Sequence, residues 1–247
     1  MTPPLAGPAG SPSIDVRAMR ASDFPGVREL SALVYPTTPS WSEAQLASHL
    51  HFFPEGQLVA VDRESGTLLG MASSLILFWE DYGLGASWRD ITDGGMFTNH
   101  DPVRGRTLYG AEVMVHPFLQ GHGIGKALYA ARRKLARKLR LLRIRAGARL
   151  RDFHRFVGRI TAEEYVHAVI CGSLGDRTLS FQLGQGFQVI GVVSGYLSHD
   201  PESLGYAAVI EWVNSAIAGV TGYRPPPWPP RPRPSGESRK RTSGSGT

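Results

Sequence analysis

Cysteine is almost missing from this chain of 247 residues, in which Cys171 is the single example. One cysteine cannot form a disulfide within the chain, and it offers no cysteine cluster for a structural zinc ion. The eight histidines show no H-x-x-x-H pair and no cysteine partner at metal-ligand spacing. We therefore expect a protein of a reducing compartment, most simply the cytoplasm, with no metal.

The chain also lacks a run of about 18 uncharged apolar residues, which is the length needed to cross a bilayer. Its first 13 residues, MTPPLAGPAGSPS, contain neither the basic start nor the apolar stretch of a secretory signal. We expect a soluble cytoplasmic protein without a membrane partner.

Acidic residues are missing from one long stretch. Between Glu112 and Asp152 there are eleven Lys or Arg residues and no Asp or Glu. Such a stretch could follow a nucleic-acid backbone, bind the phosphates of a cofactor, or form the solvated face of a helix. Nucleic acid is possible but not favoured, because no recognised nucleic-acid motif accompanies the stretch and aromatic residues are sparse there.

Composition divides the chain into three parts. Residues 1–13 consist almost entirely of Pro, Gly, Ser and Ala, and residues 224–247 are rich in Pro and then polar and basic. Such segments cannot bury enough apolar surface to fold, so we expect both to be disordered. Residues 14–223 are expected to form the folded domain, whose net charge is close to zero.

The periodicity within this domain predicts an α+β fold around one central mixed sheet with flanking helices. Residues 80–106 lack any period and indicate either a binding loop or a packed Ω-loop. The expected strands are 14–20, 56–63, 67–79, 107–117, 141–150, 186–197 and 206–213, and the expected helices are 21–35, 41–53, 123–142, 161–174 and 177–185.

A glycine-rich turn links an apolar strand to the longest helix. The strand ends at His116-Pro117, and Gln120-Gly121-His122-Gly123-Ile124-Gly125 leads directly into the helix. A helix start offers unpaired N–H groups and a partial positive charge, and glycines allow a phosphate to approach the backbone. The spacing matches neither a P-loop nor a dinucleotide fingerprint, so the turn predicts an anion site of another kind.

Gln-x-x-Gly-x-Gly after a V-x-V-x-P strand end resembles motif A of the GNAT acyltransferase superfamily, with Gln120, Gly123 and Gly125 in the family's [RQ]-x-x-G-x-[GA] pattern. The resemblance covers about residues 14–212, and it is narrower to GNAT domains fused to carbon–nitrogen hydrolases. It implies a sheet splayed open after the motif A strand and acetyl-CoA as co-substrate. The residues it assigns to the cofactor are Val113, Met114 and Val115 for pantetheine, and Gln120, Gly121, His122, Gly123, Ile124, Gly125 and Lys126 for the pyrophosphate.

Glu112 is the candidate general base. Strand alternation places it on one face with Met114 and His116, and Val113 and Val115 on the other. A carboxylate on a half-buried strand tends to a raised pKa, which suits a base near neutral pH. The alternative is a surface glutamate paired with an arginine.

A general acid is harder to find. Many family members carry a tyrosine shortly before a Gly-Phe pair, and here that position holds Gln182, before Gly186-Phe187. Tyr196 is a candidate substitute, or else a packed aromatic residue. Transfer of acetyl to an amine by direct attack can also proceed without an acid, because a thiolate is a competent leaving group.

The expected function is N-acetylation of a small-molecule or protein amine by acetyl-CoA. The alternatives are an inactive GNAT protein that only binds acyl-CoA, and a protein that associates with RNA or the ribosome through its basic helix. No pattern in the sequence indicates the acceptor or the oligomeric state.

Overall fold

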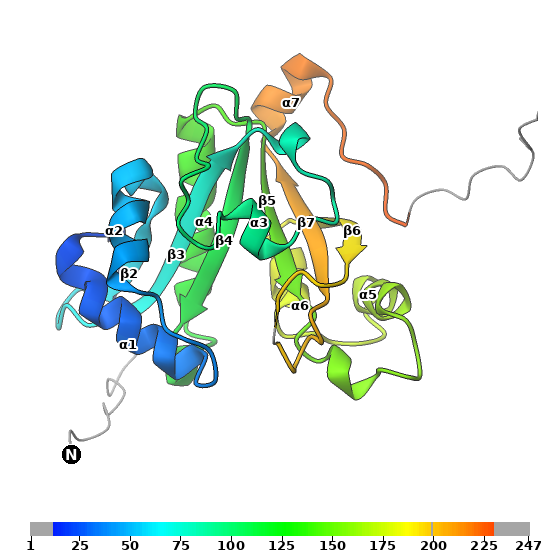
Figure 1. The fold of residues 1–247 in the computed structure, drawn as a ribbon, viewed down its shortest axis with the longest axis horizontal. Coiled ribbons are helices and arrows are strands. Elements are labelled where there is room, and N and C mark those ends of the chain that lie inside the picture. The colour runs from blue at the N-terminus through cyan, green and yellow to red at the C-terminus, as the bar shows by residue number, and fades with distance from the viewer. Residues whose placement is uncertain (1–11, 199, 230–247) are drawn as a thin grey trace, which may run out of the picture.

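One seven-stranded sheet with helices on both faces organises the chain in the computed structural model, which describes residues 12–198 and 200–229 (Figure 1). The strand order is β1-β2-β3-β4-β5-β7-β6, and every neighbouring pair is antiparallel except β4 and β5. The predicted mixed sheet is thereby confirmed. The segments expected to be disordered, 1–13 and 224–247, lie largely outside the described residues. The strands are β1 (Ile14–Ala18), β2 (Leu58–Asp62), β3 (Leu68–Leu77), β4 (Thr107–Val115), β5 (Arg143–Arg149), β6 (Gln188–Val193) and β7 (Ala207–Val213).

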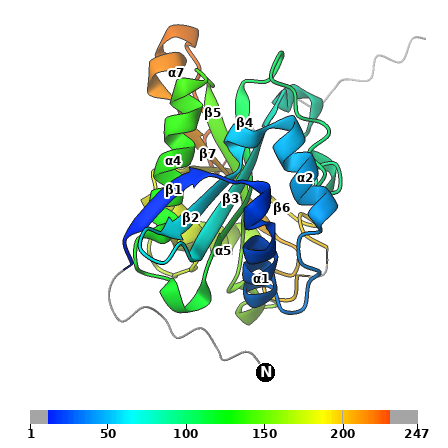
Figure 2. The same cartoon turned by 90° about the vertical axis from the view of Figure 1, so that its left-hand side faces the viewer.

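The helices divide between the two faces of the sheet. Figure 2 shows α4 on one face and α1 and α2 on the other. The apolar clusters agree, because β4 packs with α1 and α2 through Met114 and with α4 through Val113 and Val115. The helices are α1 (Phe24–Val34), α2 (Glu43–Phe52), α3 (Trp88–Ile91), α4 (Ile124–Lys138), α5 (Ala162–Ile170), α6 (Leu179–Gly184) and α7 (Ser215–Thr221).

Capping side chains set two of the helix starts that the sequence predicts. Ser42 accepts a hydrogen bond from the N–H of Gln45 at the start of α2, and Thr161 accepts one from Glu164 at the start of α5. In both helices the third residue's side chain returns to the cap backbone. These capping boxes supply partners to backbone donors that a helix start leaves unpaired.

The predicted end of the long helix was wrong. Helix α4 ends at Lys138, and Arg140 then adopts a left-handed φ of 54° that no helix continues through. Leu139, which lies within the predicted helix 123–142, is 37% exposed. Arg132 takes part in the buried face instead, four residues after Leu128.

The aperiodic stretch between β3 and β4 is a packed loop that includes α3. Ile91 and Phe97 are buried against the sheet. His49 of α2 stacks on Phe97 with ring centroids 3.7 Å apart, and its Nε2 lies 2.7 Å from the carbonyl oxygen of Gly95. The structure thus supports the packed alternative for residues 80–106.

Strands β4 and β5 separate part-way along their length. They pair only from Thr107 to Tyr109 on β4 and from Arg143 to Arg145 on β5. Beyond this point β5 continues beside β7, and β4 continues beside β3. Figure 1 shows the result as an inverted V that is closed at the top and open at the bottom. The predicted splay after the motif A strand is confirmed.

Candidate active site

The opening between the two strands begins at a β-bulge in β4. Ser74 pairs with Gly110 and Ser73 pairs with Glu112, so Ala111 is an extra residue on β4. A bulge bends a strand and re-aims its side chains, and bulges are frequent beside active sites. This one places Glu112 where β4 leaves β5.

Two side chains hold the bulge from opposite faces of the sheet. Trp88 of α3 donates from Nε1 to the carbonyl oxygen of Ala111 at 2.9 Å. Arg132 of α4 donates from Nη2 to the carbonyl oxygens of Glu112 and Ser73 at 2.8 and 3.0 Å. These side chains donate hydrogen bonds to the carbonyl groups of the bulge and thereby fix its conformation.

Arg132 is an unusual residue to find in a core, since only 1% of its surface is exposed. No carboxylate in the described part of the chain lies within ion-pair distance of it. Its Nε donates to Ser74 Oγ at 3.0 Å, and its guanidinium lies 5.5 Å from the ring centroid of Tyr129. Burial lowers the pKa of Arg132. A buried cation is costly unless its donors have hydrogen-bond partners. The carbonyl groups of the bulge supply such partners to Arg132, and Arg132 in turn supplies donors to those carbonyl groups.

Glu112 has one carboxylate oxygen held and the other open. Oε1 accepts from the phenol of Tyr35 at 3.0 Å and from the N–H of Val113 at 3.0 Å. No donor in the described part of the chain reaches Oε2. Burial raises the pKa of Glu112, and the two hydrogen bonds and the charges of Arg149 and Arg132 offset part of this rise. A carboxylate whose pKa is raised in this way binds a proton more tightly than an exposed one, which suits a general base.

The backbone assigned to pantetheine runs directly after Glu112. Met114 faces α1, on the side of Glu112, and Val113 and Val115 face α4, as the alternation predicts. Past Tyr109, β4 has no partner strand on the β5 side in the described structure. That free edge suits a ligand with amide groups, although the Val113 N–H is donated to Glu112 here.

The glycine turn before α4 has the shape of an anion site. Gly121 and Gly123 adopt left-handed φ angles of 84° and 86°, and nothing lies within 4 Å of a Cβ built on either. Gly123 is the N-cap of α4, and no side chain of the described residues caps that helix. The N–H groups of the first turn are therefore left for a ligand, and the residues present fit a pyrophosphate.

The other residues of the turn contribute unequally. Gln120, His122 and Lys126 are exposed around it. The Ile124 side chain is buried at 1% exposure, so only its backbone can face a ligand. A Cβ on Gly125 would lie 3.1 Å from the ring of Phe181 on α6, so close helix packing also accounts for that glycine.

Tyr196 lies across the sheet at the closed end of the opening. It is 5% exposed, its hydroxyl is hydrogen-bonded to that of Tyr109, and a Cβ on Gly147 would overlap its ring. Burial raises the pKa of Tyr196. These contacts are those of a packed aromatic residue.

Gln182, at the position where many family members carry tyrosine, is buried and donates from Nε2 to the phenol of Tyr129 at 2.7 Å. Within the described residues, its Oε1 is buried without a hydrogen-bond partner. Gln182 therefore occupies a packed position, bonded to a tyrosine of α4.

The acid-free stretch does not form one basic surface. Arg132, Arg143 and Arg145 are buried, and Arg149 is half-buried and paired with carboxylates. Glu211 accepts from Arg145 at 2.6 Å in the core. Cations that lie in the interior cannot follow a nucleic-acid backbone, which leaves mainly the exposed residues of α4.

Sequence reasoning missed Tyr35, Trp88, Arg132 and Arg149. Arg132 had a signal, because it lies four residues from the buried Leu128 on the apolar face of α4. The others meet Glu112 or its bulge only through tertiary packing.

No group of three His, Cys, Asp or Glu side chains that could hold a metal exists in residues 12–198 and 200–229. Within the same ranges, no helix has the length and apolarity to cross a membrane.

The splayed sheet and the glycine turn agree with a family comparison. The model of the acetyltransferase (GNAT) family matches residues 24–158, which is more than half of the chain. The chain belongs to the GNAT acetyltransferase family. Its domain is therefore an acyltransferase-type domain, and the fold and family expected from motif A are confirmed.

Two curated relatives come from Bacillus subtilis (strain 168). The chain is 39% identical to the probable hydrolase YhcX over 199 residues, which are 81% of this chain and 38% of YhcX. It is 39% identical to YkwB, named an uncharacterized N-acetyltransferase, over 180 residues, which are 73% of this chain and 78% of YkwB. The chain thus spans well under half the length of YhcX, and the similarity to part of a larger protein named a hydrolase agrees with the narrower resemblance.

Solved GNAT-like domains share the fold. The GphF GNAT-like decarboxylase, solved with isobutyryl-CoA, has a TM-score of 0.67 and 23% identity, covering 81% of this chain and 98% of GphF. The loading GNATL domain of CurA from Lyngbya majuscula has a TM-score of 0.68 and 16% identity, covering 81% of this chain and 97% of that domain. At these identities the likeness concerns the fold alone.

Proposed function

We propose that this GNAT protein is an N-acetyltransferase that transfers the acetyl group of acetyl-CoA to an amine, with Glu112 as general base. The observation that carries the proposal is the Glu112 carboxylate at the start of the opening, with Oε1 held by two donors and Oε2 open. A base needs a fixed position and a free lone pair, and this arrangement supplies both.

Acetyl-CoA would supply an activated acetyl thioester. The N–H groups at the start of α4, with Lys126 beside them, would hold its pyrophosphate, and the free edge of β4 at Val113–Val115 would hold its pantetheine. The capture of isobutyryl-CoA by GphF, which shares this fold, supports an acyl-CoA in this opening.

The proposed reaction is a direct transfer. Glu112 takes a proton from the substrate ammonium, either directly or through one water, and leaves a neutral amine with a free lone pair. The amine nitrogen attacks the thioester carbonyl carbon, so that a C–N bond forms and the C–S bond breaks. The electron pair leaves with sulfur as CoA thiolate. Of the two hydrogens left on nitrogen, one stays in the amide and the other passes as a proton to solvent or to the departing thiolate.

Proton donation to the thiolate is a secondary part of the proposal. Tyr196 is the candidate acid, but its raised pKa and its bonds within the core favour a packing role. The transfer does not depend on such a donor, because a thiolate leaves without one. The acceptor is proposed to be a small-molecule or protein amine, with the cytoplasm as its compartment.

The test is isothermal titration of the protein with acetyl-CoA, using Gly123→Glu and Gly172→Glu variants. Gly123 and Gly172 both have left-handed φ angles and open space at the Cβ, so the two substitutions cost similar strain and add the same charge. We expect micromolar binding by the parent and Gly172→Glu, and its loss in Gly123→Glu, where the carboxylate would meet the pyrophosphate.

Each alternative function corresponds to another outcome. Binding without amide formation across a broad amine panel would indicate a protein that only binds acyl-CoA. No binding in the parent would contradict the proposal and bring nucleic-acid binding by the exposed face of α4 to the front.

A further inference from the structure

Tyr35 occupies a rigid position at the end of α1. Its N–H donates to the carbonyl oxygen of Ser31 at 2.9 Å and closes the last helical turn. Its own carbonyl oxygen accepts from the N–H of Thr38 at 3.1 Å, which forms a turn with Pro36 at the second position. Proline also restricts the residue before it, so the Tyr35 backbone is constrained on both sides.

The Tyr35 phenol reaches the reactive carboxylate from a distant part of the chain. Its hydroxyl donates to Glu112 Oε1 at 3.0 Å, and the two residues are 77 positions apart. Burial raises the pKa of Tyr35 well above its ordinary value, so the phenol keeps its proton. Together with the Val113 N–H it gives Oε1 two donors, and the carboxylate cannot rotate without losing both.

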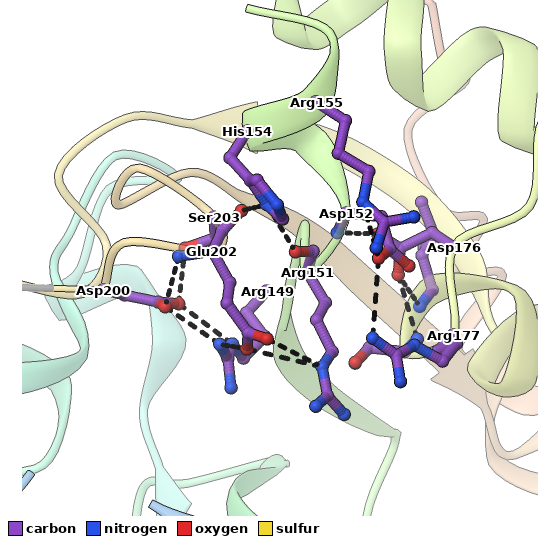
Figure 3. Close-up of polar contacts among 12 residues, drawn as sticks. Arg149, Arg151, Asp152, His154, Arg155, Asp176, Arg177, Asp200, Glu202 and Ser203 are labelled. Atoms are coloured by element: carbon purple, nitrogen blue, oxygen red, sulfur yellow. Dashed lines mark hydrogen bonds and ion pairs between the residues drawn. The ribbon is translucent and has the colours of Figure 1, made fainter. Parts of the chain in front are cut away.

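Arg149 supports Tyr35 from the other half of the sheet. Its guanidinium carbon lies 5.9 Å from the Tyr35 ring centroid, which is within cation–π range. Figure 3 shows the guanidinium bonded to Asp200 and Glu202 of the loop between β6 and β7. The two bonds to Asp200 are both 2.9 Å long, as in a bidentate pair. A continuous set of contacts thus crosses the opening from β4 to α1 to β5.

We propose that Tyr35 is a positioning residue for Glu112, holding one carboxylate oxygen so that the other faces the acceptor amine, while Arg149 holds the Tyr35 ring from across the opening. This inference rests on the proposed base role of Glu112. It adds a contact between α1 and the reactive group that motif A does not contain.

The charged and titratable groups that face Glu112 besides Tyr35 are Arg149 on β5, Arg132 and Tyr129 on α4, Tyr109 on β4 and Tyr196 in the loop after β6. The two arginines lower the pKa of Glu112, whereas the Glu112 charge raises the pKa of each of the three phenols. A substitution of Tyr35 alone leaves each of these groups in place. A change in the Glu112 titration then reports the loss of the phenol.

The experiment measures the Glu112 carboxyl directly by ¹³C NMR titration of glutamate-labelled protein. The Glu112→Gln spectrum identifies the signal by its disappearance. We expect Tyr35→Phe to raise the Glu112 titration midpoint by about one pH unit, because a hydrogen bond to the charged form is lost. Tyr165→Phe is the matched control, since it removes the phenol bonded to Asp176 on the far half of the sheet, at 2.9 Å, and should leave Glu112 unchanged.

An unchanged Glu112 midpoint in folded Tyr35→Phe would overturn the proposal. A double-mutant cycle gives a second measurement on turnover. If Tyr35 acts through Glu112, Tyr35→Phe introduced into the parent lowers kcat about 10-fold with little change in the KM for acetyl-CoA. The same substitution introduced into the Glu112→Gln variant has no further effect on kcat. Independent, additive losses would contradict it.

The two proposals fail in different ways. Absence of any acetylated amine would count against the N-acetyltransferase reaction, while the NMR titration would still decide whether Tyr35 controls Glu112. An unchanged titration beside measurable turnover would count against Tyr35 alone.

Discussion

The carboxylate of Glu112, the proposed base, shows how the surroundings of a single residue set its proton affinity. Burial raises its pKa, while Tyr35, the Val113 N–H and two arginines favour the charged form. The balance leaves a carboxylate whose pKa is raised above that of an exposed glutamate. Held at one oxygen only, it can accept a proton at the other.

We expect Glu112→Gln to lower kcat/KM by about 10²- to 10⁴-fold, the usual contribution of a general base. Glutamine keeps an oxygen for the Tyr35 phenol, so acetyl-CoA affinity should persist. In the parent, kcat/KM should fall as pH drops through the raised pKa of Glu112, and this acid limb should vanish in the variant. Turnover that survives the substitution with an unchanged pH profile would exclude Glu112 as the base.

The same shift has a consequence for stability. A folded-state pKa above the unfolded value means that the folded chain binds its proton more tightly, so stability declines as pH rises through that pKa. Glu112→Gln removes this cost. The variant should therefore unfold at the same temperature as the parent or higher near pH 8, as measured by circular dichroism.

At the scale of elements, the loop between β3 and β4 is held by specific contacts despite its irregular sequence. Phe97 has a left-handed φ of 60°, which is rare for a bulky side chain and costs free energy. Its burial and its stacking on His49 offset this cost. Trp88 of the same loop bonds the bulge of β4, so loop and active site are mechanically connected.

Protonation of His49 at low pH should destabilise the packing of this loop. Burial lowers the pKa of His49 to about 4, whereas an unfolded histidine titrates near 6.5. The unfolded chain therefore binds more protons between these values, and stability is full above about pH 6.5 and declines toward pH 4, by at most about 3 kcal/mol.

Urea unfolding across this pH range measures the effect. His49→Gln should remove most of the pH dependence, and His51→Gln, on the exposed side of the same helix, should retain it. Equal pH dependence in the parent and His49→Gln would show that other groups cause the acid sensitivity.

At the scale of the whole molecule, the sheet consists of two halves joined over a short length. Strands β4 and β5 pair with each other from Thr107 to Tyr109 of β4, and they diverge beyond this point. Helix α4 and the contacts from Glu112 through Tyr35 to Arg149 bridge the rest. A ligand in the opening would add a further bridge between the halves.

We expect acetyl-CoA at about 100 times its Kd to stabilise the fold by about 2.7 kcal/mol. Hydrogen exchange should slow at Val113–Val115 and at the first turn of α4, and neither change should occur in Gly123→Glu. Slowed exchange confined to a region away from the opening would place the cofactor elsewhere.

Local signals were sufficient for much of the fold. Alternating apolar residues indicated the strands, apolar residues at helical spacing indicated the helices, and the glycine turn before α4 indicated an anion site. These features depend on neighbours within a few residues, so they can be predicted from the sequence. The extent of α4 was overestimated because Leu139 and Leu142 continue the apolar spacing past the point where Arg140 turns the chain.

The sequence by itself therefore determined the family, the order of the seven strands and of helices α1, α2, α4, α5 and α6, a candidate anion-binding turn, and Glu112 as the residue to examine. It did not predict the short helices α3 and α7. The environment of Glu112 was decided only by folding. Tyr35, Trp88 and Arg132 come from separate helical segments and meet one bulge and one carboxylate, and Arg149 of β5 lies over the Tyr35 ring. Their proximity results from the packing of helices on a splayed sheet, and contacts across such distances along the chain leave no local pattern to read.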